Sequence, residues 1–254
     1  MKACLQALTY VCLGAAGLNA QVSLTTVNGA RIETAFPVSP GSYAQAYGNL
    51  AGVPTQTSGS VPLPTELGGI QVLIGEANTP APLYDVRSTV VSFVVPFTVA
   101  PGPQRIRVVR AGTDVASGTM NVFPVSPGIF VNLADAKRQG GILNQSGIYA
   151  VQGSPARRGE VIQIFATGQG AVSVNVPAGG VPPSGTLVNA TAKTRAWISV
   201  DEAEVLFSGL SPQFPGLWQI NLRVPDKSYL TGQVPVFVSI DGVSSNVVSF
   251  WIAQ

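Results

Sequence analysis

Short runs in which polar and apolar residues alternate recur along this chain. From Trp218 to Val224 the even-numbered positions are apolar and the odd-numbered positions are polar. A period of two is typical of a β-strand with one buried face. The segments 161–165 and 234–240 have a similar character, whereas 89–95 is almost entirely apolar, as expected for a strand covered on both faces. The pattern predicts many short strands.

Turn signals separate these strand-like runs. Asp241-Gly242 stands between two of them and suits a tight hairpin, because both residues can take positive φ angles. Asn28-Gly29 carries the same signal near the start of the chain. The segments 53–64 and 172–185 predict long surface loops, since turn-forming residues dominate them. One or two turns around 133–139 are the only helical structure that we expect.

The sequence also repeats itself, with the offset that carries Pro96 onto Pro225. The segments that this offset aligns are 94–96 with 223–225, 106–109 with 235–238, and 115–122 with 244–251. Two prolines in the stretch 123–128 stiffen the chain between the copies and mark a boundary. Each copy has about 100 residues, and about seven short strands separated by turns indicate an immunoglobulin-like sandwich.

The first 20 residues predict a secretory signal peptide. Lys2 supplies its positive charge, Ala3 to Ala16 is mostly apolar, and Leu18-Asn19-Ala20 is a suitable cleavage site. A buried N-terminal helix is the alternative, whereas the apolar run falls short of the roughly 20 residues of a membrane-spanning helix. Cys4 and Cys12 are the two cysteines of the chain, so cleavage after Ala20 leaves no cysteine and no disulfide.

These observations predict an all-β protein of two tandem domains. Residues 1–20 form the signal peptide, 21–124 the first immunoglobulin-like β-sandwich domain, and 125–254 the second. No later segment is apolar and long enough to cross a membrane.

Composition narrows the range of functions. Hydrophobic residues make up 46% of the 254 residues and charged residues only 10%, so two cores can form while few charges remain for chemistry. The sequence contains no histidine, which removes the commonest general base and metal ligand and the Ser-His-Asp arrangement. A formal net charge of +2 argues against electrostatic binding of nucleic acid.

The acidic residues offer a weak case for catalysis or metal binding. Asp201, Glu202 and Glu204 form the densest group, and two facing carboxylates could serve a glycosidase. The simpler interpretation is a solvated strand end. A calcium ion could use the same oxygens or Asp241, but no EF-hand spacing is present. Thr167 to Gly170 lacks the Lys and Ser/Thr of a phosphate-binding loop and predicts a turn after a strand.

Aromatic and polar side chains are the better candidates for ligand contact. Trp197 and Trp251 share their strand faces with small or polar residues, whereas Trp218 belongs to an apolar face and predicts a core position. Exposed aromatics stack on sugars or anchor protein partners, although burial between the two domains or under a loop is the simpler explanation. The polar face of the Trp218 strand carries candidate ligand or inter-domain contacts: Gln219, Asn221 and Arg223.

A basic group on one strand has a plain explanation. Arg105 and Arg107 share one strand face and Arg110 lies on the other, and we expect these charges to guard an edge strand against edge-to-edge pairing.

Several longer motifs resemble the Solibacter-type uncharacterised C-terminal domain family. The motifs are Val-Ser-Pro-Gly-Ser at 38–42, Tyr-Gly-Asn-Leu-Ala at 47–51, Leu-Pro-Thr-Glu-Leu-Gly-Gly-Ile-Gln-Val at 63–72, Ser-Pro-Gly-Ile-Phe at 126–130, Pro-Ala-Arg-Arg-Gly-Glu-Val-Ile-Gln-Ile-Phe-Ala-Thr-Gly-Gln-Gly at 155–170, Gly-Leu-Trp-Gln-Ile-Asn-Leu-Arg-Val-Pro at 216–225 and Asp-Gly-Val-Ser-Ser-Asn at 241–246. The resemblance implies a secreted bacterial module with IPT/TIG-like immunoglobulin character. One departure is Val91-Ser92-Phe93, where the family tends to repeat a Gln-Ile-Asn-type strand.

The sequence therefore predicts a secreted, non-catalytic binding or structural module without a cofactor, for adhesion or matrix association. Its expected partner is an extracellular protein or glycan. The alternative is an extracellular hydrolase that cleaves polysaccharide through paired carboxylates.

Overall fold

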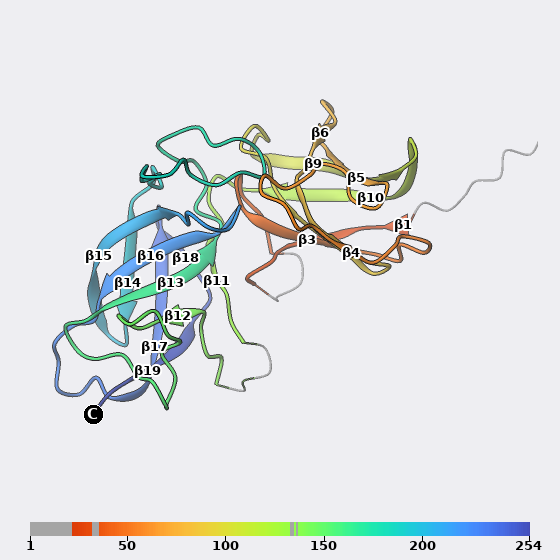
Figure 1. Ribbon diagram of the computed structural model, residues 1–254. Coiled ribbons are helices and arrows are strands. Elements are labelled where there is room, and N and C mark those ends of the chain that lie inside the picture. The colour runs from red at the N-terminus through yellow and green to blue at the C-terminus, as the bar shows by residue number, and fades with distance from the viewer. Residues whose placement is uncertain (1–21, 32–35, 133–134, 136) are drawn as a thin grey trace, which may run out of the picture.

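The computed structural model describes residues 22–31, 36–132, 135 and 137–254, and this part of the chain is built from β-strands and loops (Figure 1). The predicted signal peptide lies outside the described residues. The expected helical turns at 133–139 fall partly outside them, and the described positions of that segment are not helical. A helix able to span a membrane is absent from the described ranges.

The N-terminal half, residues 22–122, is a sandwich of two sheets. The first sheet has the order β2 (Thr25–Asn28), β3 (Tyr43–Tyr47), β8 (Val90–Val94), β7 (Leu83–Val86) and β4 (Gln56–Thr57). The second has the order β1 (Val22–Ser23), β10 (Thr113–Val122), β9 (Gly102–Arg110), β5 (Ile70–Ile74) and β6 (Thr79–Pro80). Their inner faces bury one apolar cluster that includes Phe93, Ile106 and Met120.

The C-terminal half, residues 125–254, forms a single folded-over sheet. Its path runs through β11 (Gly128–Ile129), β13 (Val161–Thr167), β16 (Trp218–Arg223), β15 (Asp201–Leu210), β14 (Thr194–Ile198), β17 (Gly232–Ile240) and β18 (Val243–Ser244), while β12 (Ile142–Leu143) pairs with β13 and β19 (Val248–Ile252) pairs with β17. The long strand β15 pairs with β14 over its first residues and with β16 from Glu204 onward. It thereby joins two layers around a second apolar cluster, which contains Trp218 and Phe250.

Strand pairing repeats between the two halves. The sequence offset of the repeat carries β8, β9 and β10 onto β16, β17 and the β18–β19 segment. In both halves the equivalent strands pair in the same order, β3-β8-β7 like β13-β16-β15, and β5-β9-β10 like β14-β17-β19. This is the strand order of the two sheets in immunoglobulin constant-type sandwiches. The internal repeat read from the sequence is therefore a repeat of topology.

Two local predictions have different outcomes. Asp241 and Gly242 connect β17 to β18 with φ angles of 49° and 80°, as the hairpin prediction required. The prediction at Asn28-Gly29 is wrong. Asn28 is fully buried at the end of β2. The N–H of Arg31 donates a 3.0 Å hydrogen bond to the carbonyl of Asn28 and closes the turn that follows.

The edge-strand interpretation of the arginine group is also wrong. β9 lies between β10 and β5, in the interior of its sheet. Arg107 forms a 2.6 Å ion pair with Asp114 on β10, and Arg105 lies 3.6 Å from the same carboxylate. These charges therefore pair across neighbouring strands instead of guarding an edge.

Candidate functional site

A polar contact joins the two halves at the start of β3. The backbone N–H of Tyr43 donates a 2.8 Å hydrogen bond to the hydroxyl of Thr167, and that hydroxyl donates to the carbonyl of Gly216, also at 2.8 Å. Thr167 is fully buried. Because a buried polar group is costly unless it is hydrogen-bonded, this arrangement favours one relative placement of the halves.

A second polar contact lies where the chain passes from one half to the other. The side-chain amide of Asn28 donates to the carbonyl of Ser126 at 2.6 Å, and the Ser126 hydroxyl donates to the carbonyl of Pro37 at 2.5 Å. The backbone of Ser126 in turn donates to the carbonyl of Gly168 at 2.8 Å. The linker around Ser126 is thus hydrogen-bonded to both halves, and Gly168, which directly follows β13, belongs to this contact.

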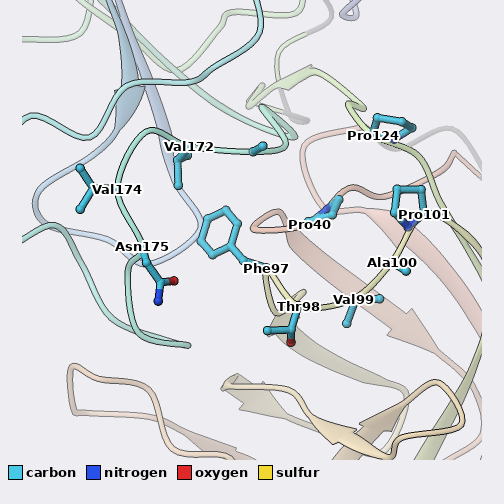
Figure 2. A pocket seen from close by; sticks show the side chains of 11 residues that line it. Pro40, Phe97, Thr98, Val99, Ala100, Pro101, Pro124, Val172, Val174 and Asn175 are labelled. Carbon is cyan, nitrogen blue, oxygen red and sulfur yellow. The ribbon is translucent and has the colours of Figure 1, made fainter.

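Apolar packing completes the junction. Figure 2 shows the ring of Phe97, from the loop after β8, directed toward Val172 of the C-terminal half. Both side chains pack against a small buried cluster formed by Val176, Val188 and Leu210. The predicted loop 172–185 is therefore partly an inter-half contact.

An aromatic groove opens at this junction. It has a volume of about 410 Å³, and each half contributes four of its lining residues. The residues that line this junction groove are Gly29, Tyr43, Gln45, Tyr84, Phe130, Phe214, Pro215 and Leu217. None of them carries a charge at neutral pH.

The rings of the junction groove are held at an angle to one another. The Tyr43 and Tyr84 ring centroids lie 5.4 Å apart with an interplanar angle of 74°, and Tyr43 and Phe130 lie 5.9 Å apart at 56°. The Tyr84 hydroxyl donates a 2.6 Å hydrogen bond to the carbonyl of Pro215. Phe214, beside it, is 55% exposed. The hydrogen bond to Pro215 therefore holds the Tyr84 ring in place, whereas the Phe214 ring is exposed to solvent.

A row of polar side chains runs across the sheet beside these rings. Gln45 on β3, Ser92 on β8 and Asp85 on β7 are cross-strand neighbours. The Gln45 amide donates to the Ser92 hydroxyl at 3.3 Å, and that hydroxyl donates to Asp85 at 3.3 Å. The Tyr47 hydroxyl donates to the Gln45 carbonyl oxygen at 2.8 Å. The outer face of β3 thus presents tyrosines alternating with an amide.

Burial raises the pKa of both tyrosines of the groove, which are neutral at pH 7 in any case. Burial raises the pKa of Tyr43 above its ordinary value of 10.0. Burial, together with the nearby Tyr43, raises the pKa of Tyr84 further. Both phenols keep their protons at neutral pH and serve as hydrogen-bonding groups and apolar surface.

A second cavity adjoins the junction groove at Phe130, which lines both. It has a volume of about 570 Å³. The residues that line this neighbouring hollow are Phe130, Val131, Asn132, Gln139, Gly140, Gly141, Tyr149 and Val151. Tyr149 is 58% exposed, and the lining again holds no charged residue.

The two tryptophans selected from the sequence lie elsewhere. Trp197 is half-buried and stacks on Phe237 with a centroid distance of 4.9 Å, and the Arg195 guanidinium lies over its ring. Its predicted alignment with Asp201 is wrong, because the strand ends in a turn at Ser199, whose φ is 57°. Its ring is thus covered from two sides.

Trp251 is half-buried on β19, opposite Gln233 of β17. Trp197 lies opposite Phe237 of the same strand, four positions away. The two tryptophans therefore share a sheet but do not form one platform.

The polar candidates on β16 bond within the C-terminal half. The Gln219 amide donates to the Asn221 side-chain oxygen at 3.0 Å. Arg223 forms a 2.9 Å ion pair with Glu204 and donates to the carbonyl of Gly159. Trp218 on the same strand is fully buried, as the alternation predicted.

The carboxylates of β15 are engaged by neighbouring side chains. Glu202 accepts two 2.7 Å hydrogen bonds from Arg195, which lower its pKa. Asp201 accepts from the Tyr229 hydroxyl. A glycosidase acid needs a raised pKa, so Glu202 is poorly suited to that role. Within the described residues, no three acidic side chains gather to hold a metal ion.

The sequence reasoning missed the residues of the junction groove. The available signal was Tyr-Ala-Gln-Ala-Tyr at 43–47, where Ala44 and Ala46 face the core and the large side chains face outward. Because alanines fill the buried positions of this strand and large side chains fill the outward ones, the pattern indicates that ligand contacts lie on the outer face.

No protein-family model and no curated protein matches the chain. The resemblance to the Solibacter-type family therefore stays a prediction.

Solved structures with distant similarity to this chain include a bacterial adhesin, a protein of a bacterial glucan utilization locus and a titin immunoglobulin tandem. The adhesin FdeC of Escherichia coli is 12% identical over 92% of this chain and 64% of its own, with a TM-score of 0.27. SGBP-B of the Bacteroides ovatus mixed-linkage glucan utilization locus, solved with a heptasaccharide, is 14% identical over 88% of this chain and 44% of its own, with a TM-score of 0.35. A titin immunoglobulin tandem is 6% identical over 85% of this chain and 90% of its own, with a TM-score of 0.23. The chain spans less than two thirds of the first two.

Proposed function

We infer that this chain is an extracellular, non-catalytic binding module of two tandem immunoglobulin-like sandwiches, residues 21–124 and 125–254, which contacts its ligand at the junction groove. One observation carries the proposal. Aromatic rings from both halves line a groove whose two sides are joined by a hydrogen bond from Tyr43 to the buried Thr167, so the site is formed before a ligand arrives. A preformed site avoids the entropic cost of ordering on binding.

The chemistry of the groove favours binding over turnover. Its lining, as far as the described residues form it, holds no acid, no base with a pKa near neutrality and no nucleophile beside a base. The whole sequence lacks histidine. Phenol groups that stay protonated can donate hydrogen bonds to a ligand but cannot remove a proton from it at neutral pH.

Extracellular placement rests on the segment 1–20. That segment has the positive start, apolar centre and small-residue end of a signal peptide. The rest of the chain contains no cysteine, so its folding does not depend on the redox state of the compartment.

The test is co-sedimentation of residues 21–254 with insoluble extracellular polymers, both polysaccharide and protein. We expect the chain to sediment with at least one class of polymer and to release neither reducing ends nor peptides. Phe214→Ala removes an exposed ring of the groove and should reduce the bound fraction. Phe123→Ala is the matched control, because Phe123 is 51% exposed and lines neither cavity.

Release of soluble product by the wild-type chain would refute the non-catalytic assignment. Binding that Phe214→Ala leaves at the wild-type level would place the site elsewhere on the molecule.

A further inference from the structure

We propose that the junction groove and the neighbouring hollow together bind a linear polysaccharide of uncharged sugars, with Phe130 between two successive sugar-binding positions. This proposal rests on the function proposed above and adds the chemical class and the direction of the ligand.

Charge selects the class of ligand. Among the residues that the structure describes, none that lines either cavity is charged. The nearest acid of the polar row, Asp85, is already engaged by the Ser92 hydroxyl and by Arg87, whose guanidinium lies 3.3 Å away. An acidic polymer would lose its hydration in this site and gain no cation in exchange, whereas an uncharged ligand has no such cost.

The surface also matches the two faces of a sugar ring. A pyranose presents flat patches of C–H groups, which pack on aromatic rings, and hydroxyls at its rim that both donate and accept hydrogen bonds. The groove offers the rings of Tyr84, Phe130 and Phe214. Beside them, the Gln45 side-chain oxygen can still accept a hydrogen bond and the Tyr43 hydroxyl can still donate one, since the Gln45 amide nitrogen already donates to Tyr43 and Ser92.

A peptide in extended conformation fits the groove less well. Peptides that bind to sheets add a strand at a free edge. β3 already pairs with β2 and β8, and β7 pairs with β8 and β4, so the strands that carry the tyrosines offer no edge here. Recognition at this face therefore depends on side chains.

Continuity of the two cavities indicates a chain longer than one or two sugars. Phe130 lines both cavities, and the exposed Tyr149 lines the hollow but not the groove. The two volumes, about 410 and 570 Å³, are each in the range of pockets that hold a small ligand. A ligand that fills both must extend past Phe130.

The experiment measures affinity by titration calorimetry for the hexamers and trimers of three neutral sugars, β-linked glucose, xylose and mannose. Hexagalacturonic acid and a proline-rich peptide are the charged and peptide probes. We expect at least one neutral hexamer to bind, with an affinity that stays within about twofold between about 0.05 M and about 0.5 M salt, since screening acts only on charges.

Two variants locate the ligand. Phe214→Ala should weaken trimer and hexamer alike, by about tenfold, through the loss of ring stacking and apolar contact. Tyr149→Ala should weaken only the hexamer, because only the longer chain reaches the hollow. Phe123→Ala should bind as the wild type does.

Four results would overturn the proposal. Binding of the acidic hexamer or the peptide alone, lost in Phe214→Ala, would refute the neutral-sugar class and leave the binding function standing. Equal effects of Tyr149→Ala on trimer and hexamer would refute the extended site. Absence of binding by every neutral hexamer, or binding indifferent to Phe214→Ala, would refute the assignment to this groove.

Discussion

The main-chain N–H of Tyr43 points at the side-chain oxygen of Thr167, 2.8 Å away and 124 positions later in the sequence. Tyr43 is also a wall of the junction groove. The hydrogen bond that joins the halves and the ring that lines the groove therefore belong to the same residue, and a change at Thr167 acts on both stability and binding.

Thr167→Val tests this coupling. The variant keeps the shape of the side chain but leaves the N–H of Tyr43 and the carbonyl of Gly216 without their partner. We expect the free energy of unfolding to fall by about 2 kcal/mol, the cost of unpaired buried groups. Urea denaturation followed by tryptophan fluorescence measures it.

Thr191→Val is the control for that change, since its hydroxyl is exposed and accepts no hydrogen bond across the junction. A surface change of this kind should stay within about 0.5 kcal/mol of the wild type. Equal effects of both variants would show that the Thr167 hydroxyl contributes nothing specific.

Gly168→Ala should prevent the close approach of the linker. An added Cβ would lie 1.8 Å from the carbonyl oxygen of Ser126, at a residue with a φ of 95°. We expect a loss of stability of more than about 3 kcal/mol or failure to accumulate as soluble protein. Gly242→Ala is the control, because Gly242 has a φ of 80° but nothing within 4 Å of the added atom, so only the conformational cost of about 1 kcal/mol applies. Similar losses in both variants would contradict the steric explanation.

Gln169→Met should stabilise the protein. Gln169 is fully buried, and within the described part of the chain neither its side-chain nitrogen nor its oxygen has a hydrogen-bond partner. Replacing the amide by an apolar group of similar volume removes a desolvation cost of about 1–3 kcal/mol. Thermal unfolding of Gln169→Met should shift upward, and that of Gln169→Glu downward. A destabilised Gln169→Met would mean that the amide is satisfied in solution.

Alkaline pH should destabilise the fold through the groove tyrosines. Unfolded tyrosines ionise near pH 10, whereas burial raises the pKa of Tyr43 and Tyr84 in the folded state. Above pH 10 the unfolded chain therefore binds fewer protons than the folded one, and the free energy of unfolding falls as the pH rises further. Urea unfolding from about pH 8 to about pH 11 measures the slope.

Tyr84→Phe supplies the comparison. It removes the most strongly raised pKa and also the hydrogen bond to Pro215, which lowers stability at every pH. The dependence on pH above 10 should nevertheless be shallower than in the wild type. Identical slopes would show that Tyr84 does not contribute to the alkaline transition.

Local features of the fold could be predicted from sequence, because they depend on neighbouring residues. The alternation around Trp218 and the Asp241-Gly242 hairpin are of this kind. The position of β9 inside its sheet could not be predicted, since Arg105 and Arg107 look alike on an edge strand and beside an acidic neighbour. Which strand supplies Asp114 is decided by pairing over the whole sheet.

The junction groove was out of reach for a related reason. Its walls come from segments separated by more than 100 residues, Tyr84 from one half and Phe214 from the other. No spacing along the chain encodes that distance. The tryptophans were predicted to contact a ligand because large exposed aromatics are the usual signal of a binding site. The ring of Trp197 is instead covered by Phe237, its cross-strand neighbour.

The parallel pairings at the sheet edges have a mechanical consequence. β1 runs alongside β10 with Val22 opposite Ala116, and Ala156 pairs in parallel with Ile252. In each half, an early segment thus points the same way as the last strand. When the early segment is pulled backward and the last strand forward, the bonds between them are loaded together in shear and do not unzip one by one. Tension along the chain therefore meets resistance at these two pairings.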